Sequence, residues 1–159
     1  VSGVDLVREQ LRIASGLPLS VTQEAVHITG HAIECRVNAE DPAADFRPCP
    51  GTVEFLHFPG GPGVRVDSCL YTGCQLPPWY DSLAAKVMAH APTRLEAIRR
   101  MRRSLEEFIL EGFPTNAELS YQILYHPDFI RGCCTTAFLD EHLPELLEFR
   151  RRLEEETKV

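Results

Sequence analysis

The sequence lacks several features that would assign it to common functional classes. It has no uninterrupted apolar run of roughly 18 residues, so we expect no membrane-spanning helix. The first residues show neither the charged start nor the apolar stretch of a secretion signal. Positive charge is also scarce, because 16 Lys and Arg against 23 Asp and Glu give a net charge of −7. This is the wrong sign for a phosphate-backbone binder, so we expect a cytoplasmic protein without membrane or nucleic-acid partners.

Cysteine spacing in this chain excludes the usual zinc and disulfide patterns. Zinc sites need paired Cys-x2-Cys or Cys/His spacings, whereas Cys69 and Cys74 are five apart and Cys133 and Cys134 are adjacent. The chain has 159 residues, enough for one domain with its own core, and does not need covalent links to fold. We therefore predict free thiols at all six cysteines and no metal site.

Glycines cluster in the segment 59–63, Pro-Gly-Gly-Pro-Gly, which invites comparison with phosphate-binding loops. The segment lacks the Gly-Lys-Ser/Thr ending of such loops and leads into a strand pattern, not the start of a helix. It is therefore a weak candidate for anion binding, and a turn is predicted.

The most informative stretch is the strand pattern from Ala32 to Glu40, where apolar and polar residues alternate strictly. One face holds Ile33, Cys35, Val37 and Ala39, and the other holds Glu34, Arg36, Asn38 and Glu40. The polar row has two interpretations: a face in contact with solvent, or the wall of a ligand site in which carboxylates orient an arginine. Periodicity alone leaves both open.

The remaining elements follow from periodicity and from capping signals. Strands are predicted at 32–40, 52–58, 64–68 and 79–91, the second and third as a hairpin. Helices are predicted at 4–15, from Thr93 to Gly112, from Thr115 to Pro127, at 136–142 and at 145–156, with one short turn at 128–131. Ser2 is the only expected cap of the first helix, whereas Thr93–Glu96 and Thr115–Glu118 are predicted capping boxes.

These elements predict an α+β fold. An antiparallel sheet of three to five strands packs against C-terminal helices and is preceded by one N-terminal helix. The apolar stripe of the long helix is assigned to the core, and four arginines opposite it are assigned to a solvent-exposed face: Arg99, Arg100, Arg102 and Arg103.

Asp81 opens the inward-facing series of the predicted strand 79–91. A buried carboxylate needs a cationic or hydrogen-bonding partner, and Arg36 would satisfy it. The alternative is that Asp81 ends in water at the edge of the strand.

Five segments of the sequence, in this order, resemble the C-terminal domain of biotin carboxylase, the ATP-dependent component of acetyl-CoA carboxylase and related enzymes. They are GHAIECRVNAEDP, RPCPG, GGPGVRVDS, PPWYDSLAAKV and EGFPTNAEL. The resemblance runs from Gly3 to about Leu143. It divides the chain into a helix from the end of the ATP-binding region (1–16), the domain itself (17–143) and a charged C-terminal helix or tail (144–159).

The resemblance implies roles for individual residues. Arg36, in the Glu-Cys-Arg motif, would be the catalytic arginine that stabilises the ureido oxygen of biotin, with neighbouring side chains that hold it in position. These neighbours are Glu34, Asn38 and Asp81, the last supported by the family's Tyr-Asp-Ser motif. Thr136 aligns with the residue that approaches the adenine pocket. Pro62 and Arg65 align with the dimer interface, where Pro62 replaces a phenylalanine of well-known bacterial members.

The resemblance also implies cofactors and partners. The complete enzyme would use ATP, Mg²⁺ and biotin on a carrier protein, act with a carboxyltransferase and form a homodimer. The family's phosphate loop, metal-binding glutamates and general base precede the matched region, so we expect this chain alone to bind no cofactor and to be inactive. The alternative is a non-catalytic dimerisation or carrier-docking module.

Overall fold

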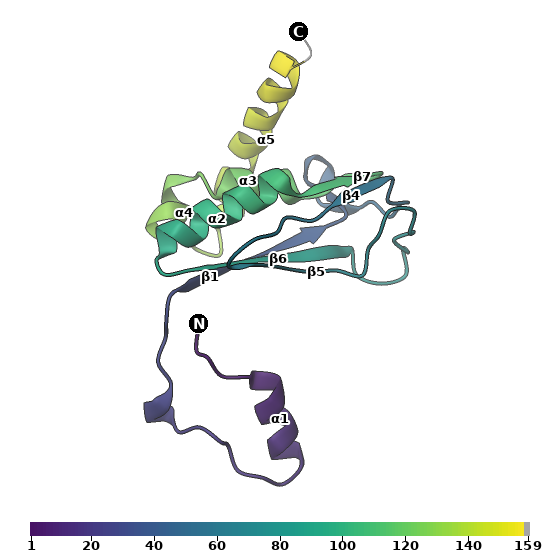
Figure 1. The fold of residues 1–159 in the computed structure, drawn as a ribbon. Helices are drawn as coiled ribbons and strands as arrows, with labels where there is room; N and C mark the ends of the chain where they lie inside the picture. The colour runs from purple at the N-terminus through teal and green to yellow at the C-terminus, as the bar shows by residue number, and fades with distance from the viewer. Residues whose placement is uncertain (158–159) are drawn as a thin grey trace.

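The computed structural model describes residues 1–157, with side chains up to residue 149, and has the predicted α+β class (Figure 1). Its helices are α1 (Leu6–Ala14), α2 (Arg94–Glu107), α3 (Ala117–Ile123), α4 (Pro127–Arg131) and α5 (Phe138–Thr157). Its strands are β1 (His31–Asn38), β2 (Glu40–Asp41), β3 (Arg47–Pro48), β4 (Phe55–His57), β5 (Val64–Asp67), β6 (Leu83–Ala91) and β7 (Ile109–Glu111). Two short 3₁₀ turns lie at Gln23–Ala25 and Pro42–Ala44.

The main sheet has three antiparallel strands in the order β1-β6-β5, within the predicted range. Residues directly opposite in such a ladder share a face, so the pairing of Arg36 with Lys86 and of Lys86 with Asp67 places these three on one face. Two small sheets, β2-β3 and β4-β7, complete the strand pairing.

The core lies between this sheet and the helices α2 and α3, which cover one of its faces (Figure 1). The predicted inward series of β1 is confirmed at Cys35, Val37 and Ala39, whereas Ile33 is half-buried. Ile98 and Met101 of α2 are fully buried against this face. The strand alternation therefore fixes which side of β1 carries the polar row.

The start of α2 confirms the predicted capping box. Thr93 accepts a hydrogen bond from the backbone N–H of Glu96, and the Glu96 carboxylate accepts one from the N–H of Thr93. The apolar stripe is buried in its centre only, because Leu95 is exposed and Ile109 belongs to β7.

The prediction of a solvent-exposed arginine face on α2 is confirmed at Arg99 and Arg103, whereas Arg100 and Arg102 are half-buried. Arg100 donates to the carbonyl of His90, and Arg103 donates to the carbonyl of Gly60 at 3.1 Å. Arg102 donates to the carbonyl of Leu124 at 2.5 Å. The accepting carbonyls belong to β6, to the end of α3 and to the turn before β5, and helical periodicity cannot reveal such contacts between distant segments.

The predicted hairpin between strands 52–58 and 64–68 is wrong. The first of these pairs with β7, as Leu56 opposite Leu110, and the second pairs with the central strand β6. Alternation identifies a strand but not its partner. Here the residues that pair with β4 follow α2 directly and were assigned to the helix.

The predicted strand 79–91 begins only at Leu83. Trp79 and Tyr80 are 83% and 87% exposed, and Asp81 is exposed as well, so the expected inward series does not start at Asp81. The partner strand β1 ends at Asn38, opposite Leu83, which leaves 79–82 without a ladder.

The C-terminal region forms one helix where two were predicted. α5 continues through Pro144 and projects away from the sheet (Figure 1). Within a helix, proline removes one N–H donor and its ring crowds the carbonyl of residue i−4, which can kink a helix without ending it, since its φ value is helical. The last two residues of the predicted tail, 158–159, lie outside the described residues.

Helix α1 forms as predicted but stands apart from the sheet (Figure 1). Its cap is Asp5, whose side chain accepts from the N–H of Arg8, and not Ser2. Glu9 is buried and accepts hydrogen bonds from both the N–H and the hydroxyl of Ser20, and these bonds lower the pKa of its carboxyl group. The apolar side chains of α1 are exposed: Leu6, Val7, Leu11 and Ile13.

Candidate functional site around Arg36

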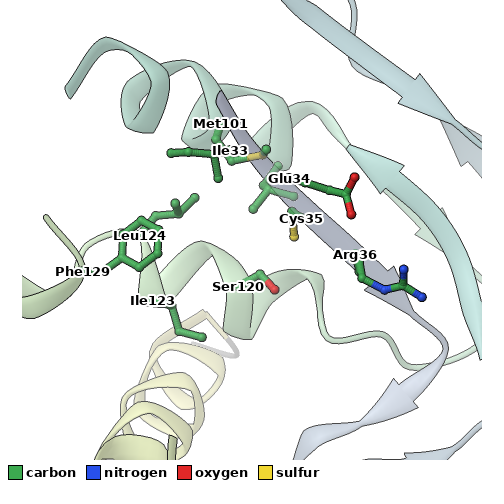
Figure 2. A pocket seen from close by; sticks show the side chains of 10 residues that line it. Ile33, Glu34, Cys35, Arg36, Met101, Ser120, Ile123, Leu124 and Phe129 are labelled. Atoms are coloured by element: carbon green, nitrogen blue, oxygen red, sulfur yellow. The ribbon is translucent and has the colours of Figure 1, made fainter. Parts of the chain in front are cut away.

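Arg36 projects from the polar face of β1, opposite the helices. Figure 2 shows Glu34 and Arg36 extending to one side of the strand, whereas Cys35 points toward Ser120 of α3. The alternation of the strand produces this arrangement, because Cys35 and Val37 are held in the core on either side of Arg36.

Arg36 has the partner that the sequence suggested. Its Nη2 donates to Oδ2 of Asp81 at 3.4 Å, and the two side chains are 48% and 65% exposed. An exposed pair at this distance contributes only ~0–1 kcal/mol to stability. Asp81 therefore orients the guanidinium loosely, from a loop position and not from the buried strand face that was expected.

A chain of hydrogen bonds continues from Asp81 into the turn after β1. The hydroxyl of Ser82 donates to Glu40 and approaches Oδ1 of Asp81 at 3.4 Å. Glu40 also accepts from Nδ2 of Asn38 at 3.2 Å, while Oδ1 of Asn38 is buried without a hydrogen-bond partner. Asn38 is therefore linked to the site through Glu40. Within the described residues, the side chain of Asn38 forms no hydrogen bond with Arg36.

Glu34 shares the face of Arg36 but forms no ion pair or hydrogen bond with it in the part of the chain that the structure describes. Across the sheet, Lys86 lies opposite Arg36 and Asp67 lies opposite Lys86. Sequence analysis missed Lys86 because it considered only the polar residues of β1. Pairing the alternation of β1 with that of β6 could have placed Lys86 beside Arg36. The face thus presents two neighbouring cations.

Asn116 is the residue that sequence analysis missed most clearly. Its Oδ1 accepts from the backbone N–H of Asn38 at 2.9 Å, and its Nδ2 donates to the carbonyl of Arg36 at 3.2 Å. Its own N–H donates to the carbonyl of Asn38 at 3.2 Å. The side chain acts as a short neighbouring strand at the edge of β1, where the ladder shifts register after Val37.

The second predicted capping box, Thr115–Glu118, does not form as expected. α3 begins after Asn116, without a side-chain capping bond at Asn116, whose amide is engaged by β1. The predicted cap Thr115 instead accepts a hydrogen bond from the N–H of Ala117 at 3.4 Å. The sequence signal for a helix start was therefore correct, but the predicted cap was not.

A cavity of about 170 Å³ lies behind β1, between the strand and helices α2 and α3. Its lining includes Ile33, Met101, Leu124 and Phe129, together with parts of Arg36 (Figure 2). Cys35 also lines this cavity. Burial raises the pKa of its thiol, which favours the neutral form.

The other predicted site residues lie away from Arg36. Thr136 is exposed between α4 and α5, and it lines neither the cavity nor the Arg36–Asp81 network. Pro62 and Arg65 are exposed at the opposite edge of the main sheet, where Arg65 forms two bonds of 2.8 Å with Asp67. These bonds hold the pKa of Asp67 below its ordinary value.

Comparison with known proteins shows the family to which the chain is similar. A family model described as the biotin carboxylase C-terminal domain matches residues 34–141. Biotin carboxylase from a Nostoc species is 50% identical over 141 residues, which are 89% of this chain and 32% of the relative. Biotin carboxylase 1 from Bacillus subtilis is 48% identical over 142 residues, covering 89% of this chain and 32% of the relative.

Among solved structures, the biotin carboxylase domain dimer of Hydrogenobacter thermophilus 2-oxoglutarate carboxylase, in complex with MgADP, ADP and bicarbonate, has a TM-score of 0.87 at 42% identity. The match covers 92% of this chain and 32% of that one. These relatives are biotin carboxylases or biotin carboxylase domains of larger enzymes. The chain belongs to the biotin carboxylase C-terminal domain family, and it spans about a third of the length of the curated relatives it matches.

Three further observations concern membrane spans, cysteines and metal-ligating side chains. Among the described residues, no helix is both long enough and apolar enough to span a membrane. All six cysteines are free thiols in the structure, as expected from their spacing. A group with metal-ligating side chains does occur at His126, Asp128 and His142, which the search for cysteine patterns missed.

Proposed function

We propose that this chain is the C-terminal domain of an ATP-dependent biotin carboxylase. The complete enzyme would convert ATP, bicarbonate and carrier-bound biotin to carboxybiotin, ADP and phosphate. The observation that carries the proposal is the presentation of Arg36, fixed by a family motif on β1, half exposed, with Asp81 at 3.4 Å.

The role of Arg36 follows from the chemistry of biotin. Removing the N1 proton of the ureido group leaves negative charge on its oxygen, and a donor already oriented at that oxygen stabilises the transition state. A guanidinium is always charged and can grip an anionic oxygen with two N–H groups.

The geometry leaves Arg36 available for this task. Within the described residues, Asp81 engages only Nη2 of Arg36. Nε and Nη1 of Arg36 are therefore open to a ligand. Asn116 holds the backbone on the C-terminal side of the arginine, at the carbonyl of Arg36 and the N–H of Asn38, and Lys86 adds a second positive charge on the same face. Glu34, Asn38 and Asp81 remain our candidates for residues that adjust its position.

The remaining assignments belong to the same proposal. ATP and Mg²⁺ would be held by other parts of the enzyme, with Thr136 at the adenine pocket. Pro62 and Arg65 would lie at a homodimer interface, and a biotin carboxyl carrier protein and a carboxyltransferase would be the partners. Residues 1–16 would belong to the ATP-binding region, which agrees with the exposed apolar side chains of α1.

The test is a chimera in which this chain replaces the matched segment of the Nostoc biotin carboxylase. We expect the isolated chain to show no bicarbonate-dependent ADP release and the chimera to carboxylate free biotin. Activity of the isolated chain above a blank would contradict the assignment of the ATP site to other segments. A folded chimera that hydrolyses ATP but never carboxylates biotin would favour the alternative of a docking or dimerisation module.

A further inference from the structure

Three side chains with metal-ligating atoms converge where α4 meets α5. His126 precedes α4, Asp128 lies in its first turn, and His142 lies in α5. One ligand atom from each lies within 4.8 Å of the other two. Oδ2 of Asp128 is 3.8 Å from Nδ1 of His126 and 3.7 Å from Nε2 of His142.

The carboxylate of this cluster is oriented in advance. Arg131 bonds Oδ1 of Asp128 at 2.5 Å, which leaves Oδ2 directed at the two imidazoles. A hydrogen bond to the distal oxygen of a ligating carboxylate is a usual feature of metal sites.

The imidazoles are held by packing. Their ring centroids are 4.3 Å apart, and the buried Phe138 lies 5.0 Å from His126 and 4.9 Å from His142. The side chains of His126, Asp128 and His142 are 14%, 32% and 25% exposed, so the cluster is largely shielded from solvent but still accessible to it.

His126 is already engaged at one ring nitrogen. Its Nδ1 accepts a hydrogen bond of 3.2 Å from the backbone N–H of Asp128, so an ion at this nitrogen would replace that hydrogen bond. The gaps of 3.7 and 3.8 Å to Oδ2 are too long for hydrogen bonds. Atoms that ligate one tetrahedral ion at ~2.0–2.1 Å lie about 3.3–3.4 Å apart, so small side-chain movements would complete the geometry.

We propose that His126, Asp128 and His142 form a binding site for one divalent transition-metal ion of the zinc type. Two imidazole nitrogens and one carboxylate oxygen select Zn²⁺, Co²⁺ or Ni²⁺ over Mg²⁺, which prefers all-oxygen ligands. The ion links α4 to α5 and leaves a coordination position for water. The site runs against our expectation from sequence that the chain binds no metal, and it is independent of Arg36 and of the proposed function.

The test is a titration of the untagged 159-residue chain with Zn²⁺ by calorimetry and with Co²⁺ by visible absorbance. We expect one equivalent of each metal to bind at micromolar concentrations and Mg²⁺ not to compete. A hundredfold excess of Zn²⁺ over its Kd should raise the melting temperature by about 5–10 °C, because the ion binds only the folded chain.

Variants locate the site. Asp128→Asn and His142→Asn should each weaken Zn²⁺ binding at least ~tenfold. The matched control His57→Asn removes an exposed imidazole from β4 and should leave binding unchanged, as should Cys133→Ser combined with Cys134→Ser, which removes the nearest exposed thiols. Melts without metal show whether each variant is folded.

Three results would overturn the proposal. They are the absence of Zn²⁺ binding at millimolar concentration, unchanged affinity in folded His142→Asn, and loss of binding in the double serine variant. The last result would assign the metal to the cysteines.

Discussion

At the scale of single residues, the position of Arg36 depends on hydrogen bonds between the side chain of Asn116 and the backbone of β1. Asn116→Ala removes the two amide bonds to the N–H of Asn38 and the carbonyl of Arg36. Losing these partners at a part-buried strand edge should lower the free energy of unfolding by about 1–3 kcal/mol, measured by urea denaturation.

The control for this variant is Gln10→Ala, which truncates an exposed amide on α1 and should stay within about 0.5 kcal/mol. Equal stability of Asn116→Ala and the parent would show that water replaces the amide and that the loop does not need it.

Thiol reactivity provides a second prediction at this scale. Burial raises the pKa of Cys35 and shields its sulfur, whereas Cys69 is exposed. In the native chain at pH 8, we expect Cys69 to react with Ellman's reagent well before Cys35, and all six thiols to react in denaturant. Equal labelling rates for the two cysteines, measured by mass spectrometry, would contradict the buried position of Cys35.

The sequence predicted the Arg36–Asp81 pair but not the reason for it. Asp81 was placed in a buried strand series, where a carboxylate requires a cation, whereas its side chain is 65% exposed in a loop. The family resemblance supplied the partner. Asn116 could not be recognised, because its bonds join residues 78 and 80 positions apart and Asn at a helix start has a simpler local explanation.

At the scale of elements, Gly112 connects β7 to the loop that follows. Its φ is +120°, and a Cβ atom there would overlap the carbonyl oxygen of Thr52. Gly112→Ala should therefore disrupt the junction of β7 with the segment before β4 and lower the free energy of unfolding by at least ~2 kcal/mol, measured by urea denaturation.

Gly73→Ala is the matched control, because Gly73 also has a positive φ of +88° but has open space around its Cβ position. It should show only the cost of the strained backbone, about 1 kcal/mol. A similar loss of stability in both variants would argue against the close approach of Gly112 to Thr52. The predicted hairpin of strands 52–58 and 64–68 would then become an alternative again.

Elements with local signals were predicted well from sequence, and their pairing was not. The alternation of β1 and the capping box of α2 depend on residues within a few positions. The pairing of β4 with β7 joins segments about 54 residues apart, and three-residue strands carry too little periodicity to be distinguished from a helix end.

At the scale of the whole molecule, the property that we expect Pro62 to affect is self-association of the chain. The outer strand β5 carries Arg65, and Pro62 lies in the turn before it. We propose that both lie at a homodimer interface, where the resemblance of the sequence to the family aligns Pro62 with a phenylalanine. Losing such an anchor from an interface can cost more than ~2 kcal/mol, or roughly thirtyfold in affinity. We expect the isolated chain to sediment as a monomer at low micromolar concentration.

Pro62→Phe tests the cause, since restoring the aromatic side chain should increase self-association, whereas Pro78→Phe, in an exposed turn elsewhere, should not. A tight dimer of the unaltered chain would show that other contacts dominate the interface.

The most direct measurement of the central claim is steady-state carboxylation of free biotin by the chimera with Arg36→Gln. If Arg36 stabilises the ureido oxygen as charge develops, kcat and kcat/KM should fall together by ~10²–10³-fold, with little change in ATP affinity. Arg36→Lys should restore only part of the loss, because a point charge cannot reproduce the planar fork. A thermal melt checks that each variant is folded, and a normal kcat in folded Arg36→Gln would contradict the catalytic role of Arg36.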